Sequence, residues 1–189
     1  MDEINFFRLS PKKFKKKLGK ILEEIDLDII QTRFDKEKNQ ELIGIKDFII
    51  NAFQKINPKI INLPKLNYSD GLSGCARDLI CEIGSLSIVA PVSIVRENDT
   101  YSLDRALCRR IINKYGKIGE KIHENFSYSV LNPIVVLCQI LSENQISIYG
   151  LKDYLYDPEL RVVGISYGQH SSLKHCVCII YANNFKEVI

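Results

Sequence analysis

The chain has 189 residues, which is enough for one domain with a hydrophobic core of its own. Its hydrophobic residues (46%), charged residues (26%) and net charge of +3 are typical of a globular protein. The nearly balanced charge and the lack of tryptophan argue against nucleic acid as a partner. The sequence contains no run of ~20 apolar residues, so no transmembrane segment is predicted. The opening Met1-Asp2-Glu3 carries acid where a secretory signal carries base, so we expect an intracellular protein, cytoplasmic or cytoskeletal.

The first third of the chain is predicted to be helical. One helix begins near Asp2, and Ser10-Pro11 starts a second, because serine favours the N-cap and proline the first helical position. Apolar side chains then recur at helical spacing through residues 14–25. Residues 26–44 are polar and weakly periodic, which predicts a short helix followed by a loop. Another amphipathic helix is expected over residues 45–56, stopped by the Asn-Pro step that follows.

Four lysines, Lys12, Lys13, Lys16 and Lys20, fall mostly opposite the apolar face of the second helix. One interpretation is a patch that binds an anionic surface. The other is an ordinary solvated helix face, which we favour because a run of charge without aromatic or glycine partners seldom carries function.

The rest of the chain predicts helices followed by strands. Ser69 or Asp70 can cap a core helix that ends near Gly84, and an extended piece follows over residues 86–95. The later elements are a helix over 102–116, a strand over 122–129, a helix opened by Asn132-Pro133, and strands over 161–168 and 174–182 that pair as a hairpin. This order predicts an α+β fold in which helices cover both faces of a small antiparallel sheet.

The six cysteines are expected to be reduced, buried thiols, because an intracellular protein of this size does not depend on disulfides. They are Cys75, Cys81, Cys108, Cys138, Cys176 and Cys178, and most of them lie within apolar helix or strand patterns. In the C-V-C unit both thiols point to one face of a strand, which predicts core packing and not a metal or redox pair.

Six motifs, in order, resemble those of a known family. They are E-I-N-F-F-R-L-S-P-K-K-F near the start, L-P-K-L-N-Y-S-D-G-L-S-G-C-A-R-D at 63–78, S-L-D-R-A with K-Y-G, H-E-N-F-S-Y-S at 123–129, D-P-E-L-R-V-V-G-I at 157–165, and G-Q-H with C-V-C-I-I-Y-A. The family is the cysteine-rich secretory, antigen 5 and pathogenesis-related class 1 domain, or CAP domain, and the likeness is to its microbial branch. The likeness spans residues 1–189 as a single domain, with an insertion-like segment at about 26–61. It implies a three-layer α-β-α sandwich.

The resemblance also implies a degenerate metal site. CAP domains often hold a divalent metal between two histidines and two glutamates, which are suitable zinc ligands. Position by position, the glutamates correspond to Glu124 and Glu143, but the histidines are replaced near Ile94 and at Leu151. Lys152 would oppose a cation beside the site. No metal or other cofactor is therefore expected.

The chain's own histidines are His123, His170 and His175. His123 stands beside Glu124, which leaves open a rescued metal site in which both are ligands. His170 falls at the tip of the predicted hairpin, where a surface role is expected. Glu124 also has a structural interpretation, in which it caps backbone amides or pairs with Lys121 or Lys152.

Three functions follow from these observations. The favoured one is a non-catalytic, intracellular module that acts by protein contact as a subunit of a larger assembly, such as a cytoskeletal or organellar complex. The alternative is a lipid- or sterol-binding CAP protein, which needs an apolar groove instead of a metal site. The least favoured is a cysteine hydrolase, because no nucleophile motif surrounds any cysteine.

Overall fold

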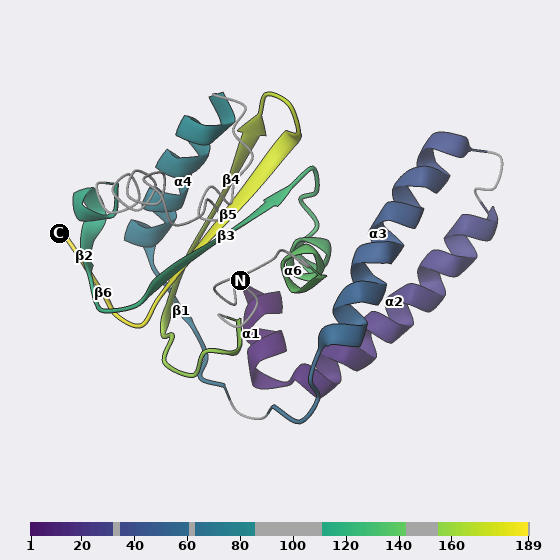
Figure 1. Cartoon of the computed structure of the whole chain (residues 1–189), viewed down its shortest axis with the longest axis horizontal. Coiled ribbons are helices and arrows are strands. Elements are labelled where there is room, and N and C mark those ends of the chain that lie inside the picture. Colours follow the sequence, from purple (N-terminus) through teal and green to yellow (C-terminus); the bar gives the residue numbers. More distant parts are fainter. Residues whose placement is uncertain (32–34, 61–62, 86–110, 143–154, 189) are drawn as a thin grey trace, which may run out of the picture.

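The computed structural model describes residues 1–31, 35–60, 63–85, 111–142 and 155–188 (Figure 1). Its helices are α1 (Asp2–Leu9), α2 (Pro11–Gln31), α3 (Lys36–Lys55), α4 (Asp70–Ser85) and α6 (Pro133–Ser142). Its strands are β1 (Asn67–Tyr68), β2 (Gly116–Ile118), β3 (Ile122–Tyr128), β4 (Val162–His170), β5 (Lys174–Ala182) and β6 (Phe185–Glu187). The expected α+β class is confirmed. The elements expected over residues 86–95 and most of 102–116 lie outside the described residues.

The main sheet has the strand order β1-β4-β5-β3. β5 pairs antiparallel with β3 and β4, and the β4–β5 hairpin is the one expected from the sequence. β1, however, pairs parallel with β4, with Asn67 opposite Val162. The sheet is therefore mixed, and the prediction of a purely antiparallel sheet is wrong. β2 and β6 form a separate two-stranded sheet.

Helices cover both faces of the main sheet (Figure 1). On one face, side chains of α1, α2, α3 and α6 pack with alternate residues of β5, namely Val177, Ile179 and Tyr181; we call this the first core. On the other face, α4 packs with Cys176, Cys178 and Ile180 of the same strand, which we call the second core. This division follows from the period of two in a strand, which sends successive side chains to opposite faces.

The α2–α3 hairpin differs from the prediction for residues 26–44. α2 continues to Gln31, and α3 begins at Lys36, where the Asp35 side chain accepts a hydrogen bond from the Lys38 N–H. The hairpin extends away from the sheet, with α2 outermost (Figure 1). In its distal part, the described residues of 26–44, no residue is buried and only Ile29, Asn39 and Leu42 are half-buried, which explains why helical periodicity is weak in this part of the sequence.

Two predicted helix starts are confirmed by their capping contacts. The Ser69 hydroxyl accepts from the Leu72 N–H at 3.1 Å, so Ser69 caps α4. The Asn132 side chain accepts from the Ile134 N–H at 3.0 Å at the start of α6.

None of the helices in the described residues is long and apolar enough to cross a membrane.

Candidate functional site

The H-E-N motif lies on β3, and its two candidate ligands point in opposite directions. His123 is opposite Tyr181 in the ladder, and Glu124 is opposite Ile180. Tyr181 belongs to the first core and Ile180 to the second, so His123 and Glu124 lie on different faces of the sheet. They cannot bind one metal ion together, and the rescued site is ruled out by the register. Burial lowers the pKa of His123 to about 4, so its imidazole is neutral at pH 7.

The remaining positions implied by the resemblance cannot be placed in the fold. Glu143, Ile94, Leu151 and Lys152 all lie outside the described residues. Among the residues that are described, no three His, Cys, Asp or Glu side chains gather closely enough to hold a metal ion.

His170 ends β4 and is 2% exposed, so the expectation of a surface role is wrong. Its Nδ1 atom accepts hydrogen bonds from the Ser172 N–H (3.2 Å) and the Leu173 N–H (3.1 Å). Its ring packs edge-on against Tyr128 at 5.4 Å between centroids. The imidazole therefore closes the β4–β5 turn by binding two of its backbone N–H groups.

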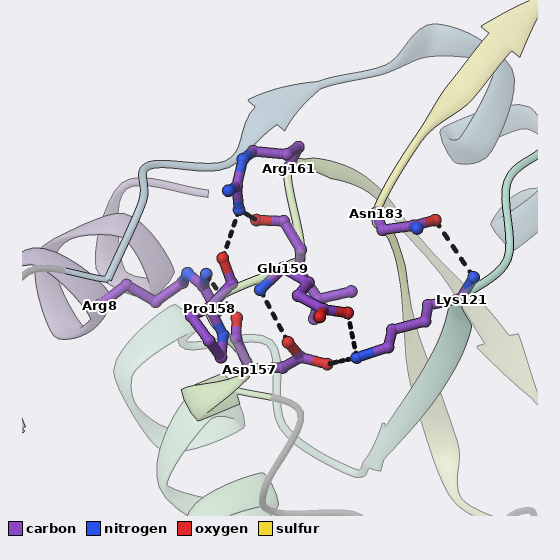
Figure 2. Close-up of polar contacts among 8 residues, drawn as sticks. Arg8, Lys121, Asp157, Pro158, Glu159, Arg161 and Asn183 are labelled. Atoms are coloured by element: carbon purple, nitrogen blue, oxygen red, sulfur yellow. Dashed lines mark hydrogen bonds and ion pairs between the residues drawn. The ribbon is translucent and has the colours of Figure 1, made fainter.

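Arg8 is fully buried, and its guanidinium connects α1 to residue 64 and to residues 155–157, which are distant in sequence. Figure 2 shows its contact with Asp157. Nε donates to the Pro64 carbonyl at 3.1 Å, and the two terminal nitrogens donate to the Leu155 and Asp157 carbonyls at 2.9 Å each. Burial lowers the pKa of Arg8 from its usual value. We call this arrangement the Arg8 clamp; it fixes α1 to the segments before β1 and β4.

Asn5, on the same helix, acts in the same way. Its side chain donates to the Leu66 carbonyl at 3.1 Å and accepts from the Leu66 N–H at 2.8 Å. Asn5 and Arg8, in the first quoted motif, thus bind backbone atoms of Leu66 and Pro64 in the second. Arg8 also binds the carbonyl of Asp157, the first residue of the D-P-E-L-R motif. These contacts give a structural explanation for three of the quoted motifs.

An ion cluster lies beside the Arg8 clamp, where β3 begins (Figure 2). The Lys121 ammonium binds the Asp157 carboxylate at 3.3 Å and also the Glu159 carboxylate. The bond to Glu159 contributes most to raising the pKa of Lys121. Burial raises the pKa of Asp157, but the Glu159 N–H and Lys121 outweigh it, and the net shift is downward. Lys121 was one of the predicted partners of Glu124; its ion pairs are with Asp157 and Glu159 instead.

The five cysteines in the described residues carry free thiols, and four of them are buried. Burial is the main cause that raises the pKa values of Cys75, Cys138 and Cys176, each to about 12, so these thiols are not ionised at pH 7. Cys81 is exposed, so its expected place in the core is wrong. Cys108 lies outside the described residues.

The distal part of the hairpin exposes large apolar side chains. Leu27 is 60% exposed, Ile30 is 65% exposed and Ile43 is 48% exposed. Closer to the main sheet, the outer face of α2 exposes Lys12, Lys13, Lys16 and Lys20. In the described part of the chain none of these four lysines forms an ion pair, whereas the neighbouring Lys17 binds Glu3 at 2.7 Å.

Sequence reasoning missed the Arg8 clamp, although a signal was present. Arg8 follows Ile4 by four residues and Phe7 by one, so it falls on the apolar stripe of α1, where an arginine must have buried partners. The exposed apolar side chains of the hairpin were missed because residues 26–44 were expected to form a short helix followed by a loop, instead of the ends of two long helices.

No family model, curated protein or solved structure shows a significant match to this chain.

Proposed function

We propose that this chain is a divergent, non-catalytic CAP-like module that acts by protein contact in a larger assembly, and that the α2–α3 hairpin makes the contact. The observation that carries the proposal is the exposure of Leu27, Ile30 and Ile43 on an element that extends from the sandwich (Figure 1). Large apolar side chains that stay exposed on one element can serve as an interaction surface, because their transfer out of water drives association.

The rest of the described chain supports this division of labour. Arg8, Asn5 and the Lys121 cluster bind backbone and side chains within the domain, so the motif residues hold the sandwich together. His123 and Glu124 of the H-E-N motif lie on opposite faces of the sheet, which does not favour a catalytic centre that uses both. The buried, protonated thiols do not favour a cysteine nucleophile.

The CAP likeness remains part of the proposal. It is supported by the contacts among the quoted motifs and by helices on both faces of the sheet. The lipid- or sterol-binding alternative remains a prediction. No feature of the described residues favours it over binding to a protein.

The proposal is tested by the native size of the protein in gentle extracts of the cells that make it. Wild type is expected to elute in a complex well above 21.7 kDa. The variant Leu27→Gln/Ile30→Gln/Ile43→Gln, which keeps the helices but makes the surface polar, should elute at a smaller size. The matched control is Tyr167→Gln, since Tyr167 is 71% exposed but lies on β4 of the sandwich. Elution of wild type as a monomer, or no difference between the variants, contradicts the proposal.

A further inference from the structure

The outer face of α2 carries a second helical seam that no described residue covers. Residues 13, 16, 20, 23, 27 and 30 follow one another at spacings of three and four, and all six are exposed. They are Lys13, Lys16, Lys20, Glu23, Leu27 and Ile30. This spacing is the one by which a helix packs lengthwise against another helix. α2 already uses its opposite face, with Phe14, Leu18 and Ile25, in the first core.

Charge is divided between the two halves of α2. Residues 12–20 contain six lysines and no acid, whereas residues 21–31 contain four acids and no base. The helix dipole favours acidic residues in the first turn and basic residues in the last turn. α2 has no acidic residue in its first turn and no basic residue in its last, so both halves have the sign that the dipole disfavours. Some of these charges are paired within the chain, since Lys17 binds Glu3 and Lys46 of α3 binds Asp26. The exposed lysines and glutamates of the outer face form no ion pair among the described residues, and a partner of the opposite polarity would complement them.

We propose that α2 pairs with α2 of a second copy of this chain, antiparallel about a two-fold axis between Lys20 and Glu23. An antiparallel pair brings the basic half of each helix to the acidic half of the other, whereas a parallel pair would bring like charges together. In this register Lys20 of each copy meets Glu23 and Glu24 of the other. The aliphatic stems of Lys16 and Lys13 cover Leu27 and Ile30.

The distribution of apolar residues agrees with this register. Leu27 and Ile30 lie at one end of the seam, so the two-fold axis places one apolar pair at each end of the contact and ion pairs at its centre. With 21 residues, α2 offers a contact of about 30 Å along its length. An anionic bilayer would suit the lysines and the apolar pair, but it would repel Glu23 and Glu24. A second copy satisfies both halves.

This inference rests on the proposed function, because it names a second copy as the partner of the hairpin. The test uses sedimentation velocity of the purified full chain at ~10–200 µM in 50 mM and 500 mM NaCl. Wild type is expected to dimerise. Its dissociation constant should be on the order of tenfold larger at high salt, because salt screens exposed ion pairs. Two variants, Lys16→Glu/Lys20→Glu and Glu23→Lys/Glu24→Lys, each bring like charges together and should be monomeric.

The decisive step is to mix the two variants in equal amounts. Each supplies the charges that the other lacks, so the mixture should form a heterodimer at low salt while each variant alone stays monomeric. All substitutions are on exposed residues, and circular dichroism checks that each variant is folded.

A wild type that stays monomeric throughout, or variants that do not associate on mixing, overturns the inference. Binding of monomeric wild type to phosphatidylserine vesicles, lost in the lysine variant, would overturn it in favour of a membrane surface. If wild type is monomeric when pure but its native complex depends on Leu27, Ile30 and Ile43, the proposed function stands and the second copy alone is rejected.

Discussion

Replacement of Arg8 by methionine tests whether the Arg8 clamp holds α1 to the sandwich. Methionine keeps the apolar stem but leaves the carbonyls of Pro64, Leu155 and Asp157 without the guanidinium that binds them at 2.9–3.1 Å. Bonds to a charged donor contribute about 1.5–3 kcal/mol each. Part of that sum is offset because a buried charge no longer has to be desolvated, and we expect a net loss of about 3–5 kcal/mol in the free energy of unfolding.

The assay is urea unfolding followed by far-ultraviolet circular dichroism. With a slope of about 2 kcal/mol per molar urea, a loss of 4 kcal/mol moves the midpoint down by about 2 M. Arg8→Lys should lie between Arg8→Met and wild type, because one ammonium cannot reproduce a planar fork of donors. Arg161→Met is the matched control: Arg161 is exposed and donates to the Pro158 and Leu160 carbonyls of its own turn, so the loss should be below about 0.5 kcal/mol. Equal midpoints for Arg8→Met and Arg161→Met would refute the reasoning.

Three further outcomes are expected. Burial lowers the pKa of His123 from ~6.5 in the unfolded chain to about 4 in the fold, so the unfolded state binds the proton more tightly and stability should fall from pH 7.5 to pH 5. The loss should be at most about 2 kcal/mol, because His123 is only partly buried and solvent screens part of the shift. His123→Phe should remove that part of the pH dependence, and an unchanged slope would count against it. Gly164→Ala should lower the free energy of unfolding by about 2–4 kcal/mol, because its Cβ atom would lie 2.2 Å from the α4 backbone. Gly44→Ala, whose Cβ atom would have nothing within 4 Å, should raise it by about 0.5–1 kcal/mol. Similar melting temperatures for the two variants would contradict the packing. In a Cys108→Ser background, native thiol labelling should modify Cys81 rapidly and the buried cysteines slowly, and a second fast thiol would disagree.

The sequence was informative where one pattern decided the structure. β5 (Lys174–Ala182) agrees with its prediction at both ends, because its continuous run of β-branched and apolar residues is buried on both faces. Ser10-Pro11 and Asn132-Pro133 located the starts of α2 and α6 because proline fixes the first helical turn.

Other features depend on contacts between distant segments, which local patterns do not report. The parallel pairing of β1 involves two residues, Asn67 and Tyr68, and nothing in so short a stretch specifies direction. His170 sits in a polar hairpin but is buried, where its Nδ1 accepts from two backbone N–H groups of the turn and its ring packs against Tyr128. Arg8 is buried because carbonyls from two distant loops converge on it.

The candidate site was predictable only in part. The position of Glu124 on a strand was predicted by the strand expected over residues 122–129. Its separation from His123 follows from strand alternation, which could have been applied to the sequence directly. The exposed apolar surface of the hairpin could not be anticipated, because Leu27 and Ile30 become informative only once α2 is known to reach Gln31.

The most direct test of the hairpin as the contact element is photo-crosslinking in cells with benzoyl-phenylalanine at position 27. The same label at position 167, an exposed site on the sandwich, is the control. The proposed function predicts a discrete covalent adduct from position 27 and none from position 167. No adduct from position 27, or the same adducts from both positions, would contradict it.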